Sequence, residues 1–174
     1  MTALRVLGID PGMATIGWSV LERAGDGYLT LGYGVIVTAA KTPWPQRLQE
    51  ISRGVREIFV KFSPQVAAIE DLFFAKDSRT ASSVGHGRGV LLYTLAELGL
   101  PITEYNPRQV KMALTGYGAA DKAQMQNMVQ RLLGLASVPK PDDAADALAI
   151  ALCHLNTRVP SPEEKNFQSL VGAR

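Results

Sequence analysis

Three apolar segments joined by short turns open the chain, and they limit the fold more than any other feature of the sequence. Residues 4–9, "LRVLGI", form a continuous run with branched side chains, which is typical of a buried strand. The segments "TIGWSVLER" and "YLTLGYGVIVT" follow the turns "DPGMA" and "AGDG" and also have the composition of strands. Three consecutive strands with short turns predict an antiparallel meander.

The spacing of apolar residues becomes helical after this meander. From Pro45 to Phe62 they recur every three to four residues, which predicts a long amphipathic helix that Ser63 and Pro64 end. The segment "QVAAIE" then predicts a short buried strand, and residues 80–98 predict a second long helix.

The second half of the chain contains one more predicted strand and three predicted helices. "PITEYN" predicts the fifth strand, and "PRQVKMAL" predicts a short helix with proline in its first turn. Asp121 and Gln124 have the spacing of a capping box for the next helix, and the last helix follows Pro141. This order of elements predicts an α/β fold of three layers, in which helices flank a mixed five-stranded sheet.

The length of 174 residues suits one domain with a substantial core. We expect that domain over residues 1–157 and a mobile tail over residues 158–174, where periodicity is lost. We expect neither a signal peptide nor a membrane span, and Cys153 is alone and cannot form an intramolecular disulfide. These features predict a cytoplasmic protein. One cysteine and two separated histidines argue against a structural zinc site.

The net charge of +2 does not identify a partner, but the distribution of the basic residues is uneven. Acids are few between residues 76 and 131, where the bases are Lys76, Arg79, Arg88, Arg108, Lys111, Lys122 and Arg131. This pattern is compatible with a surface that binds phosphate groups. Charge alone favours the simpler interpretation, which is ordinary solvated helix faces.

The start of the last helix, "PDDAADALAIALCHL", contains three aspartates in five positions. Asp142 is placed to be the N-cap residue. Asp143 and Asp146 are three apart and share a helix face, but Asp142 and Asp146 are four apart and share one as well. Spacing therefore leaves both pairs open. Acids in a first turn also complement the helix dipole, which is the alternative to a functional role.

Two more acids stand where apolar strands end. Asp10 follows the first strand, directly before the "PG" turn, and Glu70 ends "QVAAIE". Either residue alone could be a solvated loop residue, but strand ends are where α/β sheets build their sites. Converging carboxylates suit magnesium or manganese, and two such ions about 4 Å apart can promote phosphodiester hydrolysis. We therefore expect Asp10 and Glu70 to meet the acids of the last helix around metal.

Four motifs occur in an order that resembles a known family. "GIDPG", "AIEDLFFAK", "RQVKMALTGYGAADKAQM" and "DDAADALAIA" are similar to the RuvC family, the bacterial Holliday-junction resolvases, and the resemblance extends to about Asn156. It implies a ribonuclease H-like fold and an endonuclease that resolves four-way DNA junctions in recombination and repair. It also implies a homodimer that leaves 5′-phosphate and 3′-hydroxyl nicks and works with RuvA and RuvB, the branch-migration proteins.

The resemblance also assigns roles to individual residues. The catalytic and metal-binding positions that match are Asp10, Glu70, Asp143 and Asp146, so Asp142 and Asp71 lie outside the set. The implied cofactor is a pair of magnesium ions in each site, which manganese can replace. Lys111 and Lys122 match family lysines near the scissile phosphate, where positive charge would stabilise the transition state.

Further DNA contacts are expected from the loop and helix after Glu70. Phe73 matches the family aromatic that wedges between bases at the junction, and the neighbouring Phe74 is the weaker candidate. One phenylalanine could instead anchor the loop in the core. Lys76, Arg79 and Arg88 are also expected to contact phosphate groups.

Three other interpretations are compatible with parts of the sequence. "GIDPGMATIG" also resembles the phosphate-binding opening of actin-like phosphotransferases, although the chain is too short for their two similar domains. A non-catalytic module that recognises junctions by shape would not need the four acids. A relative that acts on RNA would differ in substrate, which RNA hairpins and RNA–DNA hybrids would reveal.

Overall fold

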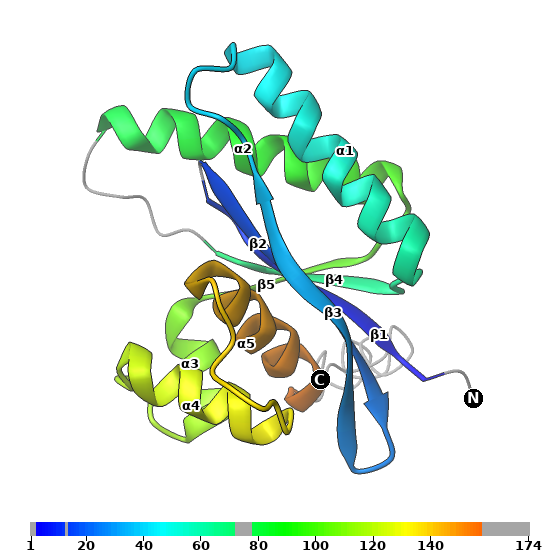
Figure 1. Ribbon diagram of the computed structural model, residues 1–174, viewed down its shortest axis with the longest axis vertical. Helices are drawn as coiled ribbons and strands as arrows, with labels where there is room; N and C mark the ends of the chain where they lie inside the picture. The colour runs from blue at the N-terminus through cyan, green and yellow to red at the C-terminus, as the bar shows by residue number, and fades with distance from the viewer. Residues whose placement is uncertain (1–2, 13, 72–77, 158–174) are drawn as a thin grey trace, which may run out of the picture.

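The computed structural model describes residues 3–12, 14–71 and 78–157, without the side chains of residues 78–83 (Figure 1). A five-stranded sheet in the order β3-β2-β1-β4-β5 forms its middle layer. The first three strands pair antiparallel, whereas β4 is parallel to both β1 and β5. The predicted meander and mixed sheet are thus confirmed. The strands are β1 (Arg5–Asp10), β2 (Thr15–Ala24), β3 (Gly27–Val37), β4 (Val66–Glu70) and β5 (Ile102–Tyr105).

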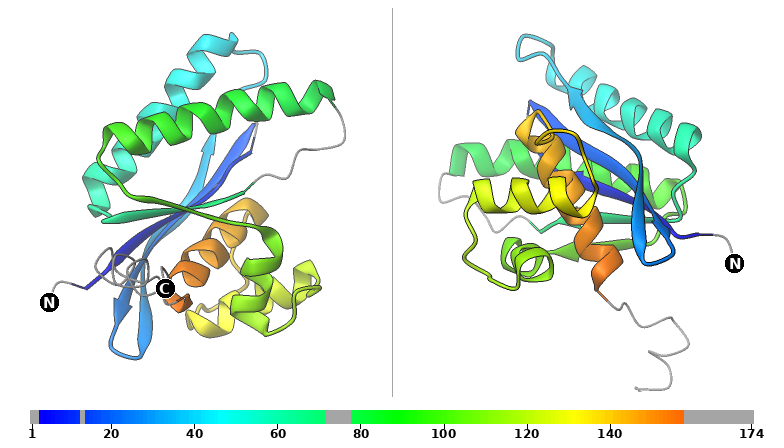
Figure 2. Two further views of the ribbon diagram at one scale, coloured as in Figure 1. Left: turned by 180° about the vertical axis from the view of Figure 1, so that it is seen from behind. Right: turned by 60° about the horizontal axis from the view of Figure 1, so that its bottom comes forward.

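Helices cover both faces of this sheet. Helices α1 and α2 lie on one face, and α3, α4 and α5 lie on the other (Figure 2). Their bounds are α1 (Trp44–Phe62), α2 (Ser78–Glu97), α3 (Pro107–Thr115), α4 (Lys122–Leu132) and α5 (Asp142–Asn156). This arrangement confirms the predicted three-layer α/β fold. No helix in the described ranges is both long enough and apolar enough to cross a lipid bilayer.

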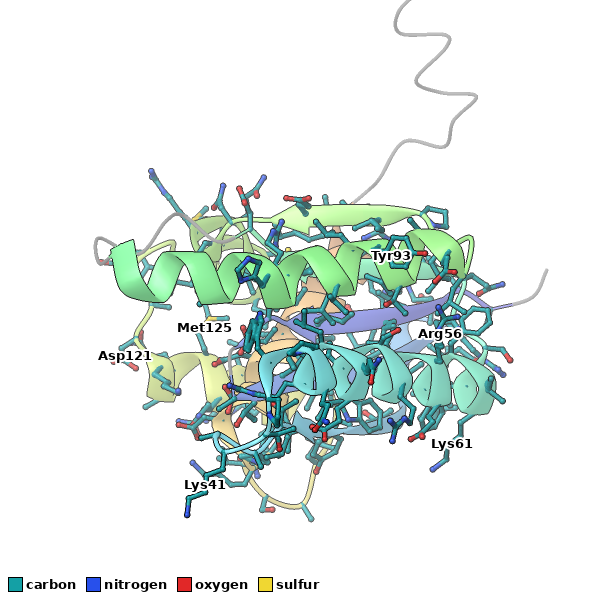
Figure 3. The ribbon with its side chains drawn as sticks, turned by 90° about the horizontal axis from the view of Figure 1, so that it is seen from above. Lys41, Arg56, Lys61, Tyr93, Asp121 and Met125 are labelled. Atoms are coloured by element: carbon teal, nitrogen blue, oxygen red, sulfur yellow. The ribbon has the colours of Figure 1, made fainter. Side chains whose placement is uncertain are left out.

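The face under α1 and α2 is held by apolar packing and by polar links between the two helices. Ile51, Val55 and Ile58 repeat at helical spacing and are buried against the sheet, as the periodicity predicts. Thr94 of α2 donates a hydrogen bond of 3.0 Å to Ser52 of α1. An ion pair between Arg56 and Glu97 joins the same two helices, and Figure 3 shows Arg56 on α1 with α2 alongside.

Helix α5 is the central helix of the opposite face and is buried from Ala147 to Leu155. It lies unusually close to the sheet because glycines face it. A Cβ atom added at Gly8 would be 2.3 Å from the carbonyl oxygen of Ala147, and one at Gly17 would be 1.9 Å from that of Asp143. Ser19 donates a buried hydrogen bond of 2.9 Å to the Ala147 carbonyl. The helix backbone therefore rests directly on β1 and β2.

The start of α5 differs from the prediction that Asp142 caps it. Pro141 occupies the N-cap position, and Asp142 is the first helical residue and makes no capping hydrogen bond. Its carboxylate instead accepts from Lys140 at 2.8 Å and lies 3.0 Å from the Lys122 ammonium. The Asp142 carboxylate thus contacts the ammonium groups of Lys140 and Lys122 and not the backbone N–H groups of the first helical turn, which it was expected to cap. The other predicted cap is confirmed, because Asp121 and Gln124 form a capping box at α4.

Candidate active site

The two strand-end acids lie side by side at one edge of the sheet. Strands β1 and β4 are parallel neighbours, and Ile9 is paired with Ile69 in their register. Asp10 and Glu70 are the next residues on each strand, and paired strands run about 4.8 Å apart. Their carboxyl groups interact directly, because a side-chain hydrogen bond with Asp10 lowers the pKa of Glu70 and the Glu70 charge raises the pKa of Asp10. The predicted meeting of these two strand ends is therefore present in the fold.

The acids of α5 are brought to the same edge by Gly17. This residue pairs with Asp10 across β1 and β2, and its missing side chain leaves room for the Asp143 carbonyl. The first turns of α5 consequently lie beside Asp10. Asp143 and Asp146 are both close enough for their charges to raise the pKa of Asp10. All four predicted carboxylates thus interact in one cluster.

Burial and mutual repulsion change the acidity of this cluster. The pKa of Asp10 is raised to about 7, first by burial and then by the charges of Glu70, Asp146 and Asp143. Burial and the Asp146 charge raise the pKa of Glu70, and burial is also the main reason why the pKa of Asp146 is raised. Lys122 opposes these shifts at Asp10 and Asp146 only in part. Nearby positive charge therefore compensates the negative charge of the four carboxylates only in part.

The donor set suits divalent cations. It consists of carboxylate oxygens, which are the ligands that magnesium and manganese prefer, and its repulsion is the kind that a cation relieves. Within the described part of the chain, no three Asp, Glu, His or Cys side chains are arranged closely enough to hold one ion as they stand. Carboxylate side chains rotate readily, whereas the sheet and α5 fix their backbone positions. The residues that would hold the metal are Asp10, Glu70, Asp143 and Asp146.

The raised pKa of Asp10 predicts that the metal-free protein loses stability as the pH rises. The carboxyl has a pKa of about 7 when folded and of 3.8 as a model value, so its contribution is complete below about pH 4 and is lost as the pH passes 7. Such a shift corresponds to at most about 4 kcal/mol. Urea unfolding in EDTA should show a smaller loss between pH 5 and pH 8 for Asp10→Asn than for the wild type.

The control for this measurement is Asp26→Asn, which changes an exposed carboxylate in the hairpin between β2 and β3. It should retain the pH dependence of the wild type. An Asp10→Asn protein with that same dependence would contradict the assignment of the raised pKa to Asp10.

Two lysines border the acids. Glu70, Asp146, Lys111 and Lys122 line one hollow of about 220 Å³, between apolar residues of α3, α4 and α5. Lys122 lies 3.0 Å from Asp142 and 3.9 Å from Asp146. No acid of the described ranges lies within 4.0 Å of the Lys111 ammonium, so this charge is available to a phosphate group. Both lysines are thus beside the cluster, as the sequence predicts.

The other predicted DNA contacts have different outcomes. Phe73, Phe74 and Lys76 lie outside the described residues, and Arg79 lies in α2 where side chains are not described. Arg88 is described, and its guanidinium is bonded to the Glu70 carbonyl and to Glu104. Whether these residues touch DNA stays a prediction.

Sequence reasoning missed Gly17, Ser19 and the role of Asp142. The glycine and serine that seat α5 are separated from it by most of the chain, so no local pattern indicates them. The partner of Asp142 on α4 is similarly remote. A glycine within a strand was the one available signal, since it often marks close approach of another backbone.

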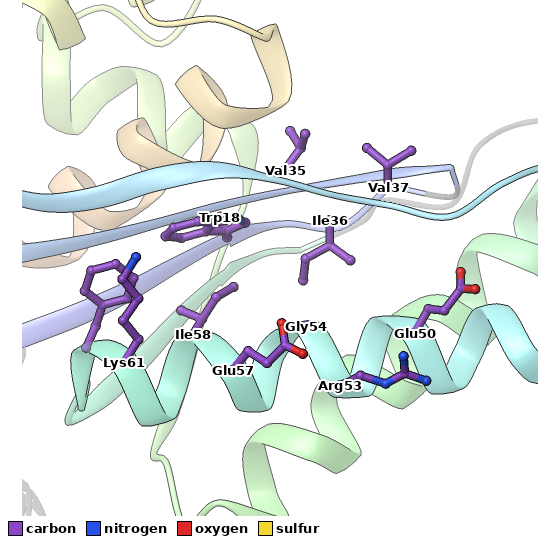
Figure 4. A pocket seen from close by; sticks show the side chains of 11 residues that line it. Trp18, Val35, Ile36, Val37, Glu50, Arg53, Gly54, Glu57, Ile58 and Lys61 are labelled. Carbon is purple, nitrogen blue, oxygen red and sulfur yellow. The ribbon is translucent and has the colours of Figure 1, made fainter.

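A second hollow, of about 420 Å³, lies between α1 and the edge strand β3 (Figure 4). Figure 4 shows Ile36 pointing toward α1 above this hollow, while Val35 and Val37 point away from it. Its rim has two acids and two bases, namely Glu50, Arg53, Glu57 and Lys61. These charges cancel, and none of the four clustered carboxylates lines it. The carboxylate cluster is therefore the better candidate for a site of phosphate chemistry.

Comparison with known proteins identifies the family. The family model described as crossover junction endodeoxyribonuclease RuvC matches residues 6–154. The chain belongs to the RuvC family. A RuvC protein from Chloroflexus aggregans is 53% identical over 154 residues, which cover 88% of this chain and 94% of that relative.

Solved structures of known proteins are also similar to this fold. Thermus thermophilus RuvC in complex with a Holliday junction substrate matches with a TM-score of 0.80 and 36% identity, over 88% of this chain and 93% of that one. The expected ribonuclease H-like fold is thereby confirmed. The yeast mitochondrial Holliday junction resolvase Ydc2 has a TM-score of 0.66 at 17% identity, over 97% of this chain and 84% of that one, and shares the fold. Membership of the RuvC family sets aside the phosphotransferase interpretation.

Proposed function

We propose that this protein resolves four-way DNA junctions by metal-dependent hydrolysis of phosphodiester bonds at the carboxylate cluster. Its relatives are named crossover junction endodeoxyribonucleases, and the solved Thermus thermophilus relative holds a Holliday junction. The observation that carries the proposal is the clustering of Asp10, Glu70 and the two α5 acids on three separate elements, with Lys111 and Lys122 beside them.

Each residue of the cluster has a role in this chemistry. Asp10 interacts with Glu70 and with both α5 acids, and these four carboxylates would together hold the two ions. When bound, the two ions supply Lewis acidity, a water molecule of lowered pKa and positive charge at the leaving oxygen. Lys111 and Lys122 would hold the phosphate and balance the negative charge that develops on it.

The reaction exchanges one phosphorus–oxygen bond for another. Water supplies the new oxygen, the bond between phosphorus and the 3′ oxygen breaks, and that oxygen takes up a proton. The products are a 5′ phosphate and a 3′ hydroxyl, which DNA ligase can rejoin. Before substrate arrives, Asp142 and Asp146 hold the Lys122 ammonium, so a phosphate must compete with these carboxylates for it.

The symmetry of the proposed substrate indicates the oligomeric state of the protein. A four-way junction has near two-fold symmetry, and a homodimer with two-fold symmetry would present one cluster to each of two strands. The sequence resemblance adds RuvA and RuvB as partners, and the single cysteine of the sequence supports the cytoplasm as the location. Magnesium is the proposed ion, and manganese its substitute.

The test is cleavage of synthetic four-way junctions with end-labelled arms. We expect paired cuts with magnesium or manganese, ends that ligase can seal and no cuts in EDTA. Linear duplexes, RNA hairpins and RNA–DNA hybrids of the same sequence should be cut at least a hundredfold more slowly. Tight junction binding without cutting in any divalent ion would favour the non-catalytic module, and faster cutting of RNA would favour the RNA-acting relative.

A further inference from the structure

Arg88 is bonded within the protein at the point where β4 ends. It extends from α2, and its side chain is only 16% exposed. Its Nη1 atom donates a hydrogen bond of 2.7 Å to the backbone carbonyl of Glu70, and its Nη2 atom donates one of 2.6 Å to Glu104 of β5. The Asp71 carboxylate lies 3.9 Å from Nη2. One planar guanidinium thus joins α2 to the ends of two neighbouring strands.

This contact acts on the backbone of Glu70 rather than on its carboxylate. The guanidinium bonds to the Glu70 carbonyl oxygen and to the Glu104 carboxylate, and within the described ranges its ion pairs are with Glu104 and Asp71, not with the Glu70 carboxylate. The charge of Arg88 is instead neutralised by Glu104 at 2.6 Å. What Arg88 fixes is the peptide plane that follows Glu70, and hence the direction in which the Glu70 side chain leaves the strand.

The peptide unit between Glu70 and Asp71 is held at both of its polar groups. The last hydrogen bond between β4 and the β5 end runs from the Asp71 N–H to the Tyr105 carbonyl, at 2.8 Å. The Glu70 carbonyl accepts from Arg88, at the edge where the carboxylate cluster lies. Without the Arg88 bond this peptide unit would be held through the Asp71 N–H alone and could rotate about that contact, and a displacement of the Glu70 side chain would separate it from Asp10.

We propose that Arg88 is a positioning residue, which holds Glu70 through its carbonyl in the orientation that divalent cations need, and that it is not a contact to DNA phosphate. The proposal rests on the proposed function, because Glu70 is taken there as a metal ligand. Groups that orient metal ligands in this way commonly alter metal affinity by about tenfold to a hundredfold when removed. Arg88 thereby links helix α2 to the position of Glu70 at the end of β4.

The experiment compares Arg88→Met and Glu104→Gln with the wild-type protein in two binding assays. Calorimetric titration of the DNA-free protein with Mn²⁺ measures metal affinity, and titration of a four-way junction in Ca²⁺ measures DNA affinity. We expect Arg88→Met to weaken Mn²⁺ binding about tenfold or more and to leave junction affinity within about twofold of wild type. Glu104→Gln removes the second anchor of the guanidinium and should weaken Mn²⁺ binding in the same direction.

The two variants distinguish positioning from phosphate binding. If Arg88 contacted DNA, Arg88→Met would weaken junction binding with unchanged Mn²⁺ affinity, and Glu104→Gln would free the guanidinium and tighten junction binding. Either result, or unchanged metal affinity in both variants, overturns the proposal. Arg53→Met, which removes an exposed positive charge from α1, is the control and should change neither affinity. A wild-type protein that neither binds Mn²⁺ nor cuts junctions would instead overturn the proposed function itself.

Discussion

Replacing Asp10 by asparagine is expected to slow junction cutting at least about a thousandfold while junction binding persists. The amide keeps the size of the side chain but removes a carboxylate that interacts with Glu70 and with both α5 acids. Asp10 is proposed above as a metal ligand, and the loss of such a ligand would cost the transition state several kcal/mol, where about 4 kcal/mol corresponds to a thousandfold in rate. Single-turnover cleavage in magnesium measures the rate, and titration in Ca²⁺ measures binding.

The junction affinity of Asp10→Asn should equal or exceed that of the wild type, because one charge that repels the DNA backbone is gone. Asp26→Asn provides the matched change far from the cluster and should cut at the wild-type rate. Cutting by Asp10→Asn at a rate close to wild type would remove the carboxylate cluster from the mechanism.

The second large effect is expected at Gly17, where even alanine should destabilise the fold. A Cβ atom there would lie 1.9 Å from the Asp143 carbonyl oxygen, and both groups belong to backbone that cannot move aside alone. Helix α5 would have to shift away from β2, which would also strain the hydrogen bond from Ser19 to Ala147. Overpacking of this kind costs about 1–3 kcal/mol, and the lost hydrogen bond adds about 1 kcal/mol. Urea unfolding of Gly17→Ala measures the sum.

Gly27→Ala is the matched control on the neighbouring strand β3. A Cβ atom at Gly27 would meet only the Ala24 carbonyl oxygen, at 3.7 Å, so the change should alter the unfolding free energy by less than about 0.5 kcal/mol. If Gly17→Ala remains folded, it should cut junctions more slowly than the wild type, because the shift of α5 would move Asp143 and Asp146 away from Asp10. A Gly17→Ala protein with wild-type stability and cutting would show that α5 is not seated in this way.

Local patterns were sufficient for the strands and helices and for two of the four acids of the candidate site. Residues 4–9 indicated a buried strand, and the structure has β1 at Arg5–Asp10. Asp10 and Glu70 were notable as acids that close apolar strands, and parallel pairing of those strands then brings them together. The choice of Asp143 over Asp142 needed the family resemblance, because helical spacing allows either one to share a face with Asp146.

What the sequence did not reveal depends on contacts between distant segments. The capping role expected of Asp142 is wrong because Pro141 occupies the N-cap position, and the Asp142 carboxylate instead pairs with Lys122 from α4 and with Lys140. The sequence also did not indicate a partner for Arg88 within the protein, and the phosphate contact expected of Arg88 stays a prediction. The partner of Arg88 within the protein is a backbone carbonyl at the end of β4, which becomes an acceptor only when the sheet has formed.

The dependence of the cluster on both β1 and α5 has a consequence for the protein while it is being made. Strands β1, β2 and β3 leave the ribosome early, but Asp143 and Asp146 are synthesised near the end and reach Asp10 only when α5 docks over Gly8 and Gly17. A nascent or prematurely terminated chain therefore carries an incomplete set of acids.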